Sequence, residues 1–193
     1  MKKIITIACL ATIVSATSGT AMADSIKGKL GVTGKIGIMV PADNNADLND
    51  NKTDAGLIGG AGLIYGIDDH IAVEVDLSHA AFGSDGGDFG VTNLSFGGQY
   101  RFALADHRLV PYVGAGLDVI FSDFEANNGT NLDVDTTVGV HVSGGVDYFI
   151  QKQLALTAEG KLVVAPDTDI EGNRGDFDPT SFSTTVGIRY FFN

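Results

Sequence analysis

Thr185-Val186-Gly187-Ile188-Arg189-Tyr190-Phe191-Phe192, one residue short of the end of the sequence, decides the fold class. When the stretch is extended back to Phe182, one alternate set of residues is mainly apolar or aromatic: Phe182, Thr184, Val186, Ile188, Tyr190 and Phe192. The other set begins with small or polar residues and includes Arg189. A period of two predicts a β-strand with one apolar and one polar face. Aromatic rings at the extreme end suit a strand that finishes at a membrane interface.

The same stretch resembles the C-terminal assembly signal of bacterial outer-membrane β-barrels. Thr185, Gly187, Tyr190 and Phe192 occupy the positions of that signal, and Asn193 follows where the signal usually ends on the aromatic residue. The resemblance implies insertion by the barrel-assembly machinery. An amphipathic edge strand of a soluble sheet is the alternative that the rest of the chain has to exclude.

Residues 1–23 are predicted to form a cleaved signal peptide. Lys2 and Lys3 form a basic start, a short apolar run follows, and Ala21-Met22-Ala23 supplies small residues before the cleavage site. The apolar run is too short for a membrane-spanning helix with ordinary flanks. The barrel domain is therefore expected over residues 24–193, on the exported side of the inner membrane.

Composition limits what this domain can do. The single cysteine, Cys9, lies in the signal peptide, so no disulfide is expected. The whole chain has 24 acidic and 12 basic residues, a balance that does not suit nucleic-acid binding. No long apolar run remains for a transmembrane helix. An acidic, glycine-rich chain without tryptophan and with few prolines is best interpreted as one all-β domain.

Eight segments of alternating character predict the strands of this domain. They lie near residues 27–40, 55–66, 71–81, 91–102, 109–122, 136–149, 153–165 and 181–192. The connections alternate between short (67–70, 103–108, 150–152) and long (41–54, 82–90, 123–135, 166–180). Short periplasmic turns and long external loops are typical of outer-membrane barrels. We therefore predict an eight-stranded antiparallel up-and-down transmembrane β-barrel, with both termini periplasmic and acidic loops extracellular.

The alternation also assigns a lipid face and a lumen face to each strand. Charged side chains facing lipid cost a few kcal/mol each, about 2–4 for a basic residue at mid-membrane. The charged positions are therefore expected to point inward and to form a paired network that fills the narrow lumen. Its predicted members are Lys35, Glu74, Asp76, Arg101, Asp118, His141, Asp147, Glu159, Lys161 and Arg189.

Three candidate sites compete with a purely structural interpretation. The acidic loops are best interpreted as a solvated surface that opposes aggregation, and the alternative is that they bind divalent cations that bridge to lipopolysaccharide phosphates. Asp167-x-Asp169-x-Glu171-Gly172 partly matches a calcium loop, but Arg174 departs from the pattern and no helices are expected beside it. His141-x-Ser143 followed by Glu159 loosely resembles the triad of the lipid A deacylase family. There the triad faces lipid, whereas the alternation here points His141 and Ser143 inward. We expect no catalytic residue, metal site or cofactor.

Two families of small barrels are similar to this chain. Pro111-Tyr112-Val113-Gly114-Ala115-Gly116 and the segment at 71–81 resemble the OmpW group, and the general layout resembles the membrane domain of the OmpA group. The first resemblance implies passage of small hydrophobic solutes, and the second implies a role in envelope integrity and surface interaction. The sequence favours a non-enzymatic barrel with a charge-plugged lumen. A narrow channel for small hydrophobic solutes, with Met39, Ile58, Ile120 and Val163 at its rim, is the alternative.

Overall fold

The computed structural model describes residues 25–42, 55–84, 87–104, 108–126, 131–169 and 176–192. The predicted signal peptide and Asn193 lie outside these ranges. Eight long strands form the barrel: β1 Leu30–Pro41, β2 Gly56–Gly66, β3 Ile71–Ser84, β4 Gly87–Arg101, β5 Leu109–Ala126, β6 Asn131–Phe149, β7 Leu154–Val164 and β10 Ser181–Phe191. Among the described residues, no helix is long and apolar enough to cross a membrane.

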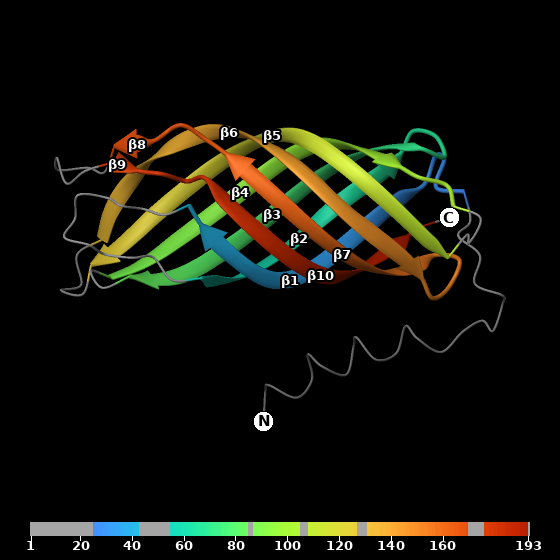
Figure 1. Ribbon diagram of the computed structural model, residues 1–193, viewed down its shortest axis with the longest axis horizontal. Helices are drawn as coiled ribbons and strands as arrows, with labels where there is room; N and C mark the ends of the chain where they lie inside the picture. Colours follow the sequence, from blue (N-terminus) through green and yellow to red (C-terminus); the bar gives the residue numbers. More distant parts are fainter. Residues whose placement is uncertain are drawn as a thin grey trace, which may run out of the picture.

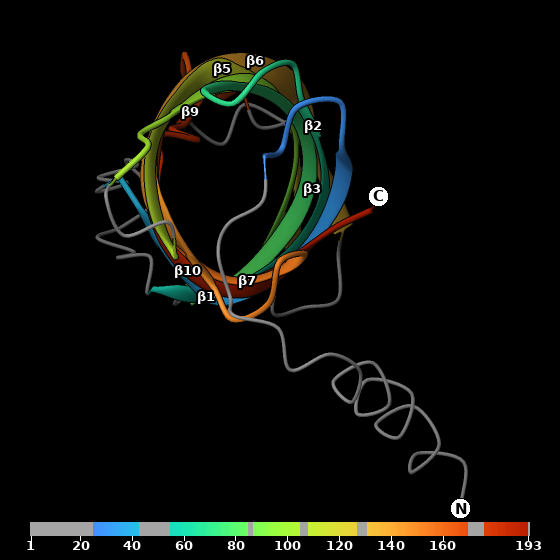
Figure 2. The ribbon, with the colours of Figure 1, turned by 90° about the vertical axis from the view of Figure 1, so that its right-hand side faces the viewer.

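The eight strands form one closed antiparallel sheet in the order β1-β10-β7-β6-β5-β4-β3-β2. Figure 1 shows the strands tilted against the long axis, and Figure 2 shows the closed ring from one end. The barrel closes where β10 pairs with β1, with Gly187 opposite Lys35 and Thr185 opposite Gly37. All other neighbours in the ring are consecutive barrel strands, so the predicted up-and-down barrel is confirmed.

The two ends of the barrel differ. Residues 67–70 and 150–153 form short connections at one end, where Phe192 also lies, and we name this the turn end. The opposite end, where the longer connections lie, is the loop end. There β8 (Thr168–Asp169) and β9 (Asp176–Phe177) form a small separate hairpin that the sequence pattern did not predict.

Two of the predicted long loops are wrong. Residues 82–90 were expected to be a loop, but β3 and β4 remain paired up to Ser84 and Gly87. Residues 123–135 were also expected to be a loop, but β5 and β6 remain paired from Glu125 to Asn131 beyond an irregularity near Ser122. Backbone pairing needs no apolar face once a hairpin leaves the membrane, so the loss of alternation does not mark the strand ends. The predicted start at residue 27 is also early, since Lys27 forms only an isolated bridge with Gly66.

The outward surface is apolar along all eight strands. Ile36, Leu57 and Val138 are 69%, 77% and 60% exposed, as residues facing lipid would be. Leu154 lies on the outward face of β7, where the alternation predicts exposure to lipid, but it is buried. The place of Tyr112 near a strand end is typical of an aromatic residue at a membrane interface. Tyr112 is buried inside the barrel, because its alternate position on β5 points inward.

The turn between β2 and β3 contains one carboxylate, Asp68, whose negative charge holds the turn together through hydrogen bonds to the backbone. Asp68 Oδ1 accepts hydrogen bonds from the backbone N–H groups of His70 and Ile71, both at 2.7 Å. These bonds lower the pKa of Asp68 below its ordinary value. The stabilisation of the turn by ionised Asp68 is therefore fully present above the unfolded-state pKa of about 4. It is lost as the pH falls through the lower pKa that Asp68 has in the folded protein.

We expect the exchange protection of the His70 and Ile71 amides to fall at acidic pH because protonated Asp68 is a weaker acceptor. Asp68→Asn keeps an oxygen acceptor that does not titrate. In this variant the protection factors of the His70 and Ile71 amides should be lower than in the wild type at neutral pH and should not change as the pH is lowered. Hydrogen exchange measured from neutral pH down to about pH 2 checks this. Equal protection of both amides in the wild type throughout that range would contradict it.

Candidate functional site

The structure places the ten predicted network residues on the inward face of the barrel. They come from β1, β3, β4, β5, β6, β7 and β10, so nearly the whole ring contributes. Arg101, Asp118, Asp147 and Arg189 are each at most 1% exposed. Buried charges at this depth are retained only with charged or hydrogen-bonding partners, and these partners lie in three successive levels along the barrel.

The level nearest the turn end contains both arginines. Arg101 Nη2 lies 2.7 Å from Asp147 Oδ2, and Arg189 Nη1 lies 2.9 Å from the same oxygen. Arg189 Nη2 also lies 3.1 Å from Glu74 Oε1, and its Nε donates to Thr33 Oγ1 at 2.9 Å. One carboxylate, Asp147, therefore joins two guanidinium groups from strands on different sides of the lumen.

Tyr112 completes this level. The guanidinium carbons of Arg101 and Arg189 lie 5.8 and 5.5 Å from the centre of its ring, within the range of cation–π attraction. The Tyr112 hydroxyl donates to Glu159 Oε2 at 3.1 Å. Tyr112 thus connects the two arginines to Glu159 of the middle level. Its position near a strand end does not indicate this role.

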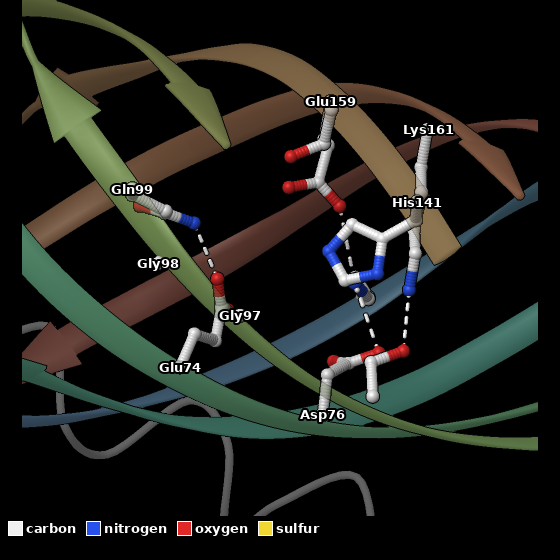
Figure 3. A pocket seen from close by; sticks show the side chains of 11 residues that line it. Glu74, Asp76, Gly97, Gly98, Gln99, His141, Glu159 and Lys161 are labelled. Carbon is white, nitrogen blue, oxygen red and sulfur yellow. Dashed lines mark hydrogen bonds and ion pairs between the residues drawn. The ribbon is translucent and has the colours of Figure 1, made fainter. Parts of the chain in front are cut away.

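The middle level is centred on Lys35. Its Nζ lies 3.1 Å from Asp76 Oδ1 and 3.2 Å from Glu159 Oε1. Figure 3 shows Glu159, His141 and Lys161 on one side of a small cavity, with Glu74 and Asp76 on the other. Gln99 Nε2 donates to Glu74 Oε2, and Glu74 also contacts Arg189 of the turn-end level.

The level nearest the loop end is centred on Asp118. Its Oδ2 lies 2.6 Å from His141 Nδ1, and its Oδ1 lies 3.1 Å from Lys161 Nζ. Ser95 Oγ and Asn93 Nδ2 also donate to Oδ1, at 2.6 and 2.8 Å. His141 therefore pairs with Asp118, the carboxylate that Lys161 also contacts, and not with Glu159 of the neighbouring strand.

This arrangement does not support the resemblance to a lipid A deacylase. His141 and Ser143 line the interior cavity, away from the lipid-facing surface. The imidazole Nδ1 is occupied by Asp118, and Ser143 lies on the same strand as His141 without a hydrogen bond to it in the described contacts. A nucleophile needs a base within hydrogen-bond reach, and a lipid substrate needs access from the membrane.

The cavities found beside Lys35 and Asp76 are small. Two cavities of about 20 Å³ each lie on either side of the Lys35–Asp76 pair. The second is lined toward the loop end by apolar side chains that include Met39, Ile58, Ala80, Val91 and Val163. A volume of this size holds about one water molecule. Three of the four predicted rim residues thus line one cavity, and Ile120 is buried elsewhere on the inward face.

An apolar cluster closes the turn end below the arginines. Phe149 and Phe191 stack with ring centres 6.0 Å apart and pack with Ile64, Ala72, Ala155 and Ile26. Ile26 reaches this cluster because the chain turns at Gly28, whose φ is 73°, and Gly28 N donates to Gly66 O at 2.7 Å. The positive φ favours glycine. We name this cluster the apolar seal. The positions of Phe149 and Phe191 in the alternation of their strands indicate that both point inward, but nothing in the sequence indicates that Ile26 joins them.

Known proteins share this architecture. The family model described as outer membrane protein β-barrel domain matches residues 7–190. The structure is similar to Neisserial surface protein A, with a TM-score of 0.69 and 16% identity over 88% of this chain and 99% of that one. It is also similar to the outer membrane protein OprG from Pseudomonas aeruginosa, with a TM-score of 0.68 and 16% identity over 86% of this chain and 97% of that one.

A further similarity is to Ail, the attachment invasion locus protein of Yersinia pestis. Its TM-score is 0.57, with 13% identity over 86% of this chain and 99% of that one. No curated protein sequence matches this chain. At these identities the solved structures support the fold, and the residues of the lumen have to support the function.

Proposed function

Because the chain belongs to the outer membrane protein β-barrel family and so resides in the bacterial outer membrane, we propose that it is a non-enzymatic structural barrel with a sealed lumen. The observation that carries this proposal is the set of buried ion pairs at three successive levels, from the Arg101–Asp147 pair to the Lys161–Asp118 pair. This set lies next to the apolar seal, and the two cavities that the described network residues line are about 20 Å³ each. A hydrated ion needs a wider path than that.

We also propose the orientation of the barrel in the membrane. The short turns and both described chain ends lie at the turn end, and short turns are periplasmic in outer-membrane barrels. The loop end then faces outward. Most of the acidic residues predicted for the long connections would be presented there, in contact with outer-membrane lipid and lipopolysaccharide. The C-terminal signal would have served the barrel-assembly machinery before folding.

The ion-pair network and the apolar seal close the lumen one after the other along its axis. The proposal can therefore be tested by combining a variant of each. Glu159→Ala removes the carboxylate that joins Lys35 to Tyr112, and Phe149→Ala opens the apolar seal. In liposomes, each single variant should pass small ions no faster than the wild type because one closure remains. The double variant should leak. The measurement is the decay of a potassium gradient across the liposome membrane.

The control for this series is Ile36→Ala, which removes an outward side chain and leaves the lumen intact. Combined with Phe149→Ala, it should not leak. A leak through Glu159→Ala alone would mean that the apolar seal does not close the barrel. If the Glu159→Ala/Phe149→Ala double variant does not leak potassium, the ion-pair network is not the second closure of the lumen.

A second candidate function is entry of small apolar solutes from the loop end. The favouring observation is the apolar lining of the outer cavity by Met39, Ile58 and Val163. We expect a small apolar probe to enter this cavity and contact its apolar lining only if the cavity widens. Uptake of such a probe by the wild type, reduced in Met39→Gln, would favour this candidate over the sealed barrel.

A further inference from the structure

The outward surface of the barrel carries a wide groove that crosses β1, β10, β7 and β6, four neighbouring strands of the ring. Its volume is about 1030 Å³. The outward side chains along it are apolar and include Val32, Ile36, Val146, Leu156, Val186 and Ile188. Protein pockets that bind small molecules have volumes of about 300–1,000 Å³, so this groove is large enough to hold a ligand.

Two small residues form the floor of the groove. Gly34 on β1 lies opposite Ile188 of β10, and Ala158 on β7 lies opposite Val186 of the same strand. A Cβ at Gly34 would meet nothing within 4 Å, so the space above this residue is open. The inward-facing Thr33 also lines the groove, because the glycine beside it leaves the strand backbone uncovered.

The shape of the groove favours a flexible chain over a second barrel as its occupant. Ile36 and Val186 are 69% and 57% exposed, and their side chains project farther from the backbone than those of Gly34 and Ala158. A second convex barrel would rest on the projecting side chains and leave gaps over the small residues, and such gaps lose van der Waals contacts. Because this surface faces the membrane hydrocarbon, the flexible chain available to fill it is the acyl chain of a lipid.

The groove reaches aromatic and basic residues at the turn end. Tyr148 and Tyr190 line it there, and the turn that joins β6 to β7 contains the exposed Lys152. The Tyr190 hydroxyl donates to Gln153 Oε1 at 3.4 Å, which places the end of this ring beside the same turn.

The basic residues outside the lumen gather at this end of the barrel. Among the residues that the structure describes, they are Lys27, Lys29, Arg108 and Lys152. The described acidic residues of the turn end, Asp68 and Asp69, lie in the turn between β2 and β3, which the groove does not reach. Lysine close to a membrane surface attracts anionic lipid headgroups. The basic end of the groove therefore complements a lipid with a negative headgroup.

We propose that this groove binds an acyl chain of one anionic glycerophospholipid, whose phosphate lies against Lys152. In the orientation proposed above, the turn end faces the periplasm, so the lipid comes from the inner leaflet of the outer membrane. The choice of leaflet rests on the proposed function, whereas binding itself depends only on the groove and on Lys152. The sealed lumen and the lipid site can therefore fail independently.

Native mass spectrometry of the refolded full barrel, released from detergent, tests the proposal. The probes are phosphatidylglycerol and phosphatidylcholine with identical acyl chains, added together in equal amounts. The wild type should retain one lipid per barrel. It should retain about fivefold more phosphatidylglycerol than phosphatidylcholine, the effect of one basic residue near an anionic lipid surface.

Two variants separate the acyl chain from the headgroup. Gly34→Leu combined with Ala158→Leu fills the floor of the groove and should abolish lipid retention. Lys152→Gln should still retain one lipid but should bind the two phospholipids equally. Gly98→Leu is the matched control, because Gly98 is an exposed outward glycine on β4, away from the groove, where a Cβ would meet nothing closer than 3.8 Å. It should retain lipid as the wild type does.

Three results would overturn the proposal. The first is a wild type without bound lipid, and the second is an equal loss of lipid in Gly98→Leu and in the groove-filling variant. The third is a wild-type dimer without lipid that becomes a monomer when the groove is filled, because a second copy of the chain would then be the occupant. An unchanged preference for phosphatidylglycerol in Lys152→Gln would overturn the assignment of the phosphate to that residue.

Discussion

Asp147→Ala is expected to lower the free energy of unfolding by about 3–5 kcal/mol, the range for breaking a buried ion pair by removing one partner. Asp147 is fully buried and lies within 2.9 Å of a guanidinium nitrogen of both Arg101 and Arg189. Without it, two arginines share the lumen with Glu74 as their nearest described carboxylate. Their mutual repulsion then adds to the desolvation that Asp147 had offset.

The measurement is equilibrium unfolding in denaturant, in detergent or lipid vesicles. The chain has no tryptophan, so circular dichroism of the β-sheet is the suitable signal. Asp167→Ala is the matched control, because this carboxylate is exposed at the loop end, and its stability should change by less than about 0.5 kcal/mol. A change of the same small size in Asp147→Ala would contradict the importance of the arginine level.

Gly187→Ala is expected to prevent formation of the closed barrel. A Cβ at Gly187 would overlap the Gly34 carbonyl oxygen, and a Cβ at Gly37 would overlap the Thr184 carbonyl oxygen. Both glycines lie on the pairing of β1 with β10, where the sheet closes. The obstructing atoms are backbone atoms, so they can move only if the two strands separate.

Refolding of purified chains into detergent, followed by their migration in unheated gels, measures this effect. Gly187→Ala should remain unfolded under conditions in which Gly34→Ala refolds fully. No assembly machinery is present in this experiment. Normal refolding of Gly187→Ala would show that Gly187 matters only as part of the assembly signal, and not for the packing of the seam.

Most of the barrel could be predicted from the sequence because a period of two controls which side chains face lipid. Apolar and polar residues alternate from Phe182 to Tyr190 apart from Thr184, and the structure exposes Phe182, Val186 and Ile188 while burying Arg189. The same parity places the ten charged residues of the predicted network inside. The eight-stranded closure follows from the number of such segments.

Pairing partners and strand ends could not be predicted in this way. Parity states that Asp118 and His141 point inward, but only the register between β5 and β6 brings them together. The strands extend past the apolar band toward Ala126 and Asn131 because backbone pairing continues in water. The position of Tyr112 along its strand suggests an interfacial residue, and only its parity indicates that the side chain points inward. Ile26 depends on a turn at Gly28 outside the periodic segments.

Flux through the wild-type protein in liposomes tests the central claim most directly, using small ions and a small apolar probe side by side. The sealed lumen predicts that both cross no faster than in protein-free liposomes. Steady ion conductance through the wild type would contradict it, because the ion pairs from Arg101 to Lys161 and the apolar seal would then leave a continuous water-filled path.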